Sequence, residues 1–483
     1  MESKPPIAVE LWNRIPTFIQ TVLLTLISRL FEQIAYLKET IKAQNAKIEE
    51  LNKNSTNSSL PPSKDKPNVK RAKPKNNKRK RKKGAQKGHE KHQRPLVPTD
   101  QVNEIIPCKP TDCENCAATL EGDDPNFERH QTFEIPPIVP HVTEYQIHTL
   151  PCKCCGHHNK GSLPDGVGPG HFGPYLVSMI SLFTGVCRLS KRMIQRLLQE
   201  VFNLQISIGQ ICRLQAKMAD ALDPCVAEAK NYIRTQHTNI DETGWKQRAK
   251  RCWLWVAVSR LVVLILIRPS RGAKVLEEIL GPEYTKIVTS DRAKAYDTLP
   301  LELRQLCWAH LDRDFQAMID RENCGSAVGM RLSKDTDQLF EWWQKVRDGT
   351  WTRKTFQHRL YKLREEFLSA FEFGSQCGCP KTAATCRELL QRESALWTFA
   401  YVEGVEPTNN EGEREARHPV TYRKICFGTD SEQGSKFIGN IMTVSASLRR
   451  QGRNVMEFLV ASYKAFCQDT APPSILPEED IPI

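Results

Sequence analysis

The chain has 483 residues, more than one compact core usually holds, so two to four domains are expected. Its 40% hydrophobic and 26% charged residues are ordinary for a soluble globular protein. The longest apolar run, Leu261–Ile267, is too short to cross a bilayer, and residues 1–20 do not resemble a signal peptide. These features exclude a typical membrane protein and predict a cytoplasmic one with no membrane partner.

The net charge of +13 is concentrated in one short segment. Residues 64–94 contain fifteen Lys or Arg against two acids, which accounts for the whole excess. A positive charge of this density indicates a polyanionic partner.

Residues 1–53 are predicted to form a coiled coil that joins two chains into a homodimer. Isoleucine recurs every seven residues from Ile27 to Ile48. Three residues after each isoleucine stands a leucine, except once, where Gln44 takes its place. Isoleucine at the first core position of the heptad and leucine at the second favour a parallel two-stranded coil. The alternative is a single amphipathic helix packed on its own domain.

Residues 54–100 are predicted to be a disordered basic linker, because they lose all periodicity and have little apolar content. The linker contains a run of six basic residues that would bind nucleic-acid phosphates: Lys78, Arg79, Lys80, Arg81, Lys82 and Lys83. The alternative is a merely solvated tail.

Residues 101–164 are predicted to be a zinc-binding module. Most of the 17 cysteines stand singly in apolar surroundings, as buried thiols do in a reducing compartment. Two CxxC pairs differ from these single cysteines in their close spacing. They would supply four thiolates to one Zn²⁺: Cys113, Cys116, Cys152 and Cys155. Four thiolates leave no open position for a substrate, so this site would be structural. Possible substitute ligands are Cys108, Cys154, His157 and His158.

Residues 165–235 are predicted to be helical, with one helix over 190–202 and a second from about Ser207 to Ala221. Ser207 is a suitable N-cap residue. A short joint between two helices suits a helix-turn-helix, which would place Gln210, Arg213 and Lys217 on or near an exposed face. Plain helical packing is the alternative.

From residue 236 the pattern changes to short strands. Residues 239–243, 253–259 and 262–267 are predicted to form three consecutive strands, followed by a helix over 273–280 and a fourth strand over 286–290. This order matches the start of a ribonuclease-H-like fold, in which the first and fourth strands are neighbours. Asp241 and Asp291 would then lie side by side, and two adjacent carboxylates favour a divalent cation between them.

A third carboxylate is predicted in the segment Thr408–Arg414, where helix propensity resumes. Glu413 is the favoured residue and Glu411 the alternative. Three acids that hold Mg²⁺, or Mn²⁺, suit the in-line displacement of a phosphodiester. The basic side chains that follow would contact DNA phosphates: Arg414, Arg423 and Lys424.

These motifs, in this order, resemble the IS66 family of transposases along nearly the whole chain. The resemblance is carried by NSSLPPSKD at 57–65, the two CxxC pairs, DET at 241–243, SDRAKAY at 290–296, CWAH at 307–310, NNEGER at 409–414, RK at 423–424 and FG at 427–428. Two departures are Arg292, where the family usually has glycine, and Gly412, where it usually has alanine. Neither changes a carboxylate.

The resemblance implies a multidomain α+β protein. Beyond the segments above, it implies a catalytic core over 236–315 and 406–468, interrupted by a helical insertion over 316–405, and a disordered tail over 469–483. Within the insertion, tryptophans 342, 343, 351 and 397 are expected in the core, whereas Cys377, Cys379 and Cys386 lack the usual metal-ligand spacing. Cys307 and His310 could bind zinc or pack under the site.

The implied activity is a DDE-type DNA transposase that uses Asp241, Asp291 and Glu413. It would cut double-stranded DNA at the element's terminal inverted repeats and transfer the strand into target DNA, associated with the nucleoid and aided by accessory proteins of the same element. The alternative is a catalytically inactive, transposase-derived DNA-binding regulator.

Overall fold

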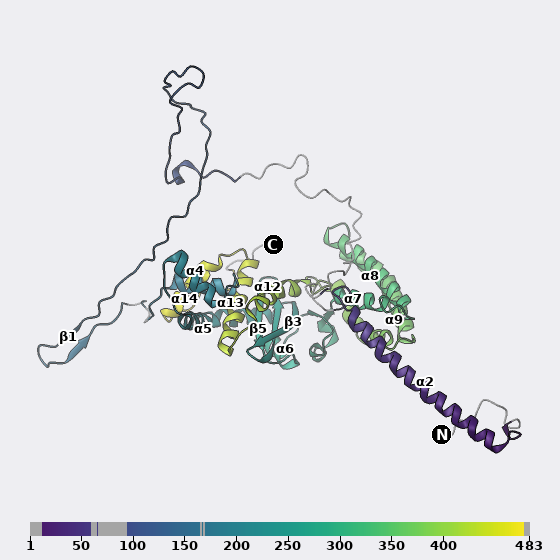
Figure 1. The fold of residues 1–483 in the computed structure, drawn as a ribbon. Helices are drawn as coiled ribbons and strands as arrows, with labels where there is room; N and C mark the ends of the chain where they lie inside the picture. Colours follow the sequence, from purple (N-terminus) through teal and green to yellow (C-terminus); the bar gives the residue numbers. More distant parts are fainter. Residues whose placement is uncertain (1–11, 59–64, 66–93, 165–166, 168–169, 478–483) are drawn as a thin grey trace. The chain divides into compact units, whose positions relative to one another are not determined.

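The computed structural model describes residues 12–58, 65, 94–164, 167 and 170–477. The predicted phosphate-binding run Lys78–Lys83 lies outside the described residues. The chain divides into two compact units, one made of residues 73–144 and 195–206 and the other of residues 1–72, 145–194 and 207–483. The second unit is a mixed α+β structure built on a central sheet (Figure 1).

The central sheet has five strands in the order β5-β4-β3-β6-β7. Strands β3 (Thr238–Gln247), β4 (Lys250–Val258) and β5 (Val263–Arg268) form an antiparallel meander. Strand β6 (Val288–Ser290) then pairs with β3 in parallel, and β7 (Arg304–Leu306) pairs with β6 in parallel. The predicted neighbourhood of the first and fourth strands is therefore confirmed, whereas β7 was not predicted.

A layer of helices covers the β5 edge of the sheet: α3 (Pro174–Gly185), α5 (Ile208–Ile233), α13 (Glu432–Arg450) and α14 (Val455–Cys467). The N–H groups of this edge strand point to α13, where Thr443 Oγ1 accepts from Ile265 N at 2.9 Å and Ser447 Oγ accepts from Val263 N at 3.0 Å. Backbone donors that an edge strand would expose are thus satisfied inside the core. Gly439 allows this approach, since a Cβ there would lie 3.0 Å from Ile265 O.

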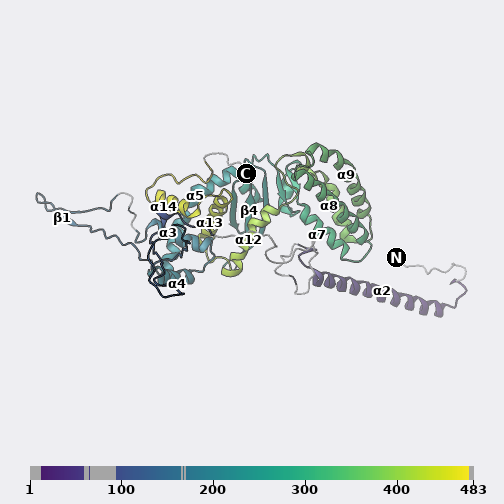
Figure 2. The same cartoon turned by 90° about the horizontal axis from the view of Figure 1, so that it is seen from above.

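The opposite end of the sheet carries the helical insertion (Figure 2). It consists of α7 (Trp308–Ile319), α8 (Ser326–Arg347), α9 (Arg353–Ser375), α10 (Pro380–Gln391), η5 (Glu393–Leu396) and α11 (Thr398–Tyr401). Its apolar side chains form one cluster with Ile287 and Leu306 of the sheet region. Trp343 and Trp397 are buried in that cluster as expected, whereas Trp342 and Trp351 are only half-buried.

Short elements complete the two units. Helix α6 (Ala273–Leu280) agrees with the predicted helix and ends at Gly281, whose φ of 77° favours glycine. The turns η3 (Lys294–Thr298) and η4 (Leu301–Leu303) connect β6 to β7, and η2 (Thr99–Gln101) begins the cysteine-containing region. Strands β1 (Thr149–Pro151) and β2 (His158–Lys160) form a separate hairpin.

The N-terminal helix α2 (Thr17–Asn52) has 36 residues and no buried side chain. The apolar seam predicted for a coiled coil is exposed along it, with Leu30, Ile34, Leu37 and Ile41 each 45–56% accessible. Among the described residues α2 is also the one helix long and apolar enough, by length and composition, to cross a membrane. The sequence criterion based on the longest apolar run did not detect this property.

The C-terminal segment differs from the expected disordered tail. Ile475 is fully buried, and its N–H donates to Glu228 Oε2 at 2.8 Å. Gln451 and Arg453 donate to the carbonyl of Ile475. Because these contacts fix residues 474–476 against α5, the ordered fold extends past residue 469.

Candidate active site

Asp241 lies within β3, and Asp291 directly follows the neighbouring strand β6. The parallel register pairs Thr238 with Val288 and Asn239 with Thr289, and two further steps place Asp241 opposite Asp291. Asp291 follows β6 directly, and its Oδ1 accepts from Ala293 N at 2.8 Å, which holds the turn. Asp241 and Asp291 therefore lie next to each other on neighbouring strands, as the predicted strand order requires.

Helix α12 (Asn410–Cys426) brings Glu413 close to Asp241. Asn409, at the N-cap position, is fully buried and donates from Nδ2 to Ile240 O at 2.7 Å. The N–H of Asn409 is 3.1 Å from Cys307 Sγ, and Trp308 N donates to Pro407 O. These contacts attach the first turn of α12 to β3 and α7, so Glu413 faces the strand ends. Cys307 accordingly packs beneath the site, one of its two expected roles.

The electrostatics of Asp241 reflect this convergence. Burial, together with repulsion from Glu242, Glu413 and Asp291, raises the pKa of Asp241 to about 7. A carboxyl surrounded by other carboxylates is stabilised in its charged form by a cation. The donor set, all carboxylate oxygen, is the chemistry that Mg²⁺ and Mn²⁺ prefer.

Basic side chains engage the carboxylates directly. Arg313 Nη2 lies 2.7 Å from Glu413 Oε1, and His310 Nε2 lies 3.7 Å from the same oxygen. His310 Nδ1 is buried without a hydrogen-bond partner, and burial together with Arg313 lowers the pKa of this histidine. Across the described residues no three His, Cys, Asp or Glu side chains are grouped closely enough to hold a metal ion. Glu413 would have to leave Arg313 to join such a group.

Glu242, Tyr296 and Arg271 form a network that sequence reasoning missed. The Glu242 side chain is 1% exposed and accepts from Tyr296 Oη at 2.6 Å and from Arg271 Nε at 2.7 Å. Arg271 Nη2 also lies 3.9 Å from Asp291 Oδ2. Burial and Asp291 raise the pKa of Glu242. Glu242 directly follows Asp241, but adjacency on a strand normally means opposite faces, so no local signal marked it.

The alternative third acid and the predicted phosphate-binding residues of α12 have different surroundings. Glu411 pairs with Arg450 and is not among the groups that shift Asp241. Arg423 Nη1 lies 3.3 Å from Thr243 Oγ1, while Arg414 and Lys424 are exposed. Arg292 turns toward the insertion, where it pairs with Asp314 at 2.6 Å and Glu388 at 2.8 Å. This departure from the family pattern therefore adds a tether to α7 and α10.

The two CxxC pairs adopt the same local fold. In the first, Cys113 N donates to Ala118 O and Ala117 N donates to Cys113 O. In the second, Cys152 N donates to His157 O and Gly156 N donates to Cys152 O. The fifth residue of each has positive φ, 57° at Ala117 and 72° at Gly156. Backbone N–H groups lower the pKa of Cys113 and Cys152. Each turn thus favours a thiolate at its first cysteine, and the sulfur donors of the two pairs fit Zn²⁺. The pairs belong to different units, so their meeting at one ion stays a prediction.

The predicted helix pair is present as α4 (Lys191–Phe202) and α5. Ser207 caps α5 by accepting from Gln210 N at 3.1 Å, and Arg213 and Lys217 are exposed. Helix α5 continues through Pro224 to Ile233, twelve residues beyond the predicted end. Docking of these residues in a DNA groove stays a prediction.

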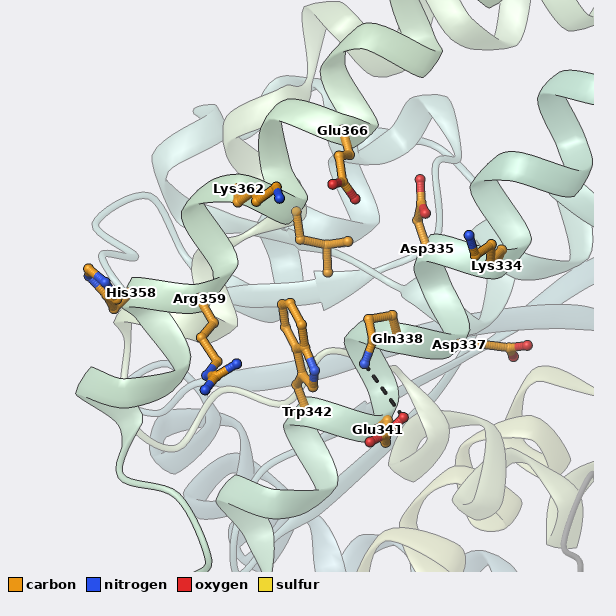
Figure 3. Close-up of a pocket in the computed structure, with 11 residues that line it drawn as sticks. Lys334, Asp335, Asp337, Gln338, Glu341, Trp342, His358, Arg359, Lys362 and Glu366 are labelled. Atoms are coloured by element: carbon orange, nitrogen blue, oxygen red, sulfur yellow. Dashed lines mark hydrogen bonds between the residues drawn. The ribbon is translucent and has the colours of Figure 1, made fainter.

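A separate cleft of about 840 Å³ lies between α8 and α9. Figure 3 shows Asp335 of α8 and Glu366 of α9 directed into the gap, with Trp342 on one wall. Burial and Glu366 raise the pKa of Asp335, whose Oδ2 has no hydrogen-bond partner. Four carboxylates line this cleft against three Lys or Arg, so it does not suit a nucleic-acid phosphate.

A mixed sheet whose strand ends and neighbouring helix gather acidic side chains is the kind of site that enzymes acting on phosphodiesters use. The profile of the transposase IS66 family matches residues 177–437, more than half of the chain and a range that includes Asp241, Asp291 and Glu413. The chain therefore belongs to the IS66 family of transposases. Residues 10–95 match a second family, described as a family of unknown function (DUF6444). No curated protein matches the chain significantly.

Proposed function

We propose that this transposase cuts DNA at the terminal inverted repeats of its element and joins the cut end to target DNA, with Asp241, Asp291 and Glu413 holding divalent metal. The supporting observation is geometric. Strand β3, the end of β6 and the first turn of α12 converge, and each contributes one carboxylate. We also propose that the meander β3–β5 with its parallel neighbours β6 and β7 is a ribonuclease-H-like core.

The chain's own residues would position the reacting groups. Asp241 and Asp291, fixed on adjacent strands, define one side of the site, and Glu413 closes it when it exchanges Arg313 for the cation. Bound Mg²⁺ or Mn²⁺ would supply Lewis acidity to the attacking and leaving oxygens of an in-line displacement. Arg414, Arg423 and Lys424 would hold DNA phosphates along α12.

The overall reaction would consist of two displacements at phosphorus. Water attacks the phosphodiester at the element's end, a P–O bond forms, and the 3′ oxygen leaves as a hydroxyl after taking a proton. That 3′-hydroxyl then attacks a target phosphodiester, loses its proton and expels another 3′ oxygen. Each step exchanges one P–O bond for another, so no covalent protein–DNA intermediate or redox partner is needed.

The test is cleavage of a plasmid that carries the element's ends in the presence of Mg²⁺. Asp241→Asn, Asp291→Asn and Glu413→Gln should each reduce nicking by roughly a thousandfold or more while end binding, followed by fluorescence anisotropy, is retained. Glu411→Gln is the matched control, because Glu411 lies two residues away and pairs with Arg450. Normal nicking by the Glu413 variant, with loss in the Glu411 variant, would reassign the third acid. Binding without nicking by the wild type would instead identify a regulator.

A further inference from the structure

Helix α12 ends at a side chain that the active site does not use. Phe427 is 80% exposed, although it belongs to the well-packed unit that contains the central sheet. Its backbone is left-handed, with φ 61° and ψ 13° at the C-cap of α12. That conformation is usual for glycine at a helix end and unfavourable for phenylalanine. An exposed aromatic residue held in a strained conformation indicates a functional constraint.

The segment that follows fixes this strain in place. Gly428, with φ 101°, lies against the carbonyl of Lys246, where no side chain would fit. Thr429 N donates to Lys246 O at 3.0 Å, and Arg248 N donates to Thr429 O at 2.7 Å. Residues 428–429 are therefore bonded to the tip of the β3–β4 hairpin. Beneath them, Tyr422 stacks on Trp245 with ring centroids 6.1 Å apart. The benzyl group of Phe427 is thus presented from a rigid base.

The two chain segments that join at the hairpin tip next to Phe427 are rich in basic residues, although Glu432 follows them directly. Residues 246–251 and 423–431 contain six Lys or Arg and one acid, Asp430. The basic residues are Lys246, Arg248, Lys250, Arg251, Arg423 and Lys424. An exposed aromatic ring among cationic side chains matches the way proteins bind unstacked nucleic-acid bases, with phosphates on the cations and a base on the ring.

Helix α12 also sets the distance between Phe427 and Glu413 of the candidate active site. Glu413, Arg417 and Lys424 fall on one stripe of the helix at spacings of four and seven residues, and the helix ends at Phe427. Fourteen residues of α-helix span roughly 21 Å, about the length of six base pairs. α12 runs alongside β3 in the same direction, from Ile240 at its start to Gln247 at its end.

We propose that Phe427 stacks on an unpaired or unstacked base of the DNA, about six base pairs from the scissile phosphate. The inference rests on the proposed function, since it requires DNA to lie along α12. The ring would stabilise opened DNA near the cut, and the cations of the hairpin and of α12 would hold the flanking phosphates. Phe427 would then act as a positioning residue that distinguishes distorted from regular duplex.

The experiment compares two fluorescein-labelled 30-base-pair probes of the same sequence, one fully paired and one with three central mismatches, by anisotropy. Wild type should bind the mismatched probe at least tenfold more tightly. Phe427→Ala should lose that preference and keep its affinity for the paired probe within about twofold, whereas Phe427→Trp should retain the preference. Phe373→Ala is the matched control, because Phe373 is an exposed aromatic residue of α9, 67% accessible.

A second variant separates stacking from folding. Phe427→Gly removes the ring and suits the positive φ, so the melting temperature should stay the same or rise while the preference for mismatched DNA is lost. Retention of that preference by Phe427→Ala, or its equal loss in Phe427→Trp, would overturn the inference. A change in oligomeric mass without a change in DNA binding would identify a protein-docking residue instead. If wild type binds neither probe, the proposed function itself fails.

Discussion

At the scale of single residues, Asp241 contributes to the pH dependence of the stability of the unit that contains the central sheet. Its pKa is raised from 3.8 to about 7, so the folded chain binds this proton more tightly than the unfolded chain. The resulting stability is fully present below pH 4 and is lost as the pH rises to about 7, by about 4 kcal/mol at most. Without added metal, the melting temperature should therefore fall between pH 5 and pH 8.

Asp241→Asn removes the titrating group and keeps its shape, so its melting temperature should change less over the same range. The measurement is thermal unfolding by circular dichroism in a metal-free buffer series. Added Mg²⁺ should restore wild-type stability at pH 8 and leave the variant unchanged. Parallel curves for the two proteins would show that Asp241 is not responsible for the dependence.

Gly412 shows how a neighbouring side chain can exclude the alanine that the family pattern leads one to expect. A Cβ at this position would lie 2.6 Å from Oδ1 of the buried Asn409, whose amide holds α12 to β3. Gly412→Ala should therefore displace Asn409, lower the free energy of unfolding by about 1–3 kcal/mol and reduce DNA nicking as Glu413 moves. Chemical denaturation measures the first effect and the plasmid assay the second.

The control is Gly209→Ala in the first turn of α5, where the nearest atom to a new Cβ is Ser207 Oγ at 3.9 Å. This exposed substitution should be neutral or stabilising by up to about 1 kcal/mol. If the two alanine variants behave alike, Asn409 tolerates the methyl group and the close contact has no energetic consequence.

At the scale of secondary-structure elements, each CxxC turn prepares its thiols separately for metal. Neither turn alone offers four sulfurs, so replacement of one cysteine in either CxxC pair should reduce bound zinc from one ion per chain to almost none. We expect this for Cys113→Ser and Cys152→Ser, measured as zinc content by mass spectrometry after purification. Cys187→Ser, at an exposed single cysteine, should keep the full zinc content. If the Cys113 and Cys152 variants each keep bound zinc, the two turns do not share an ion.

Elements with strong local signals were predicted well. The apolar runs of β4 and β5 and the helix 273–280 with its glycine stop agree with the structure. Strand β7 was missed because it has three residues, one of them the buried Arg304, and owes its place to pairing with β6. Helix α5 was expected to end at about Ala221, but burial of Cys225, Ala229 and Ile233 sustains it to Ile233.

The candidate site was predicted only in part, because local sequence signals mark its three acids but not the partners that pair with them over long range. Asp241 lies in a recognisable strand, Asp291 directly follows another, and Glu413 is in the first turn of a recognisable helix, so the sequence pattern alone suggests their proximity. The partners Arg313, Arg271 and Tyr296 come from other elements, and only the folded chain brings them to Glu413 and Glu242. Such long-range pairing leaves no periodic trace in the sequence.

At the scale of the whole molecule, the exposed apolar seam of α2 is a surface that we expect a partner to cover. A single helix with this much apolar surface in water is unstable unless another surface covers it. The spacing of isoleucine and leucine fits a second copy of the same helix, whereas the overall hydropathy also fits a membrane. The two explanations predict different masses in solution and different behaviour toward lipid.

We expect the purified chain to be a dimer of twice 55.1 kDa by light scattering, and Ile34→Lys combined with Ile41→Lys to be a monomer, because buried lysines disrupt the seam. Glu39→Lys with Ala46→Lys adds the same two side chains on the opposite face of α2 and should remain dimeric. Wild type should not float with vesicles of uncharged phosphatidylcholine in a density gradient, a lipid that the basic segment 64–94 does not attract. A dimer that survives the isoleucine replacements would place the interface elsewhere, and flotation that those replacements abolish would make α2 a membrane-binding helix.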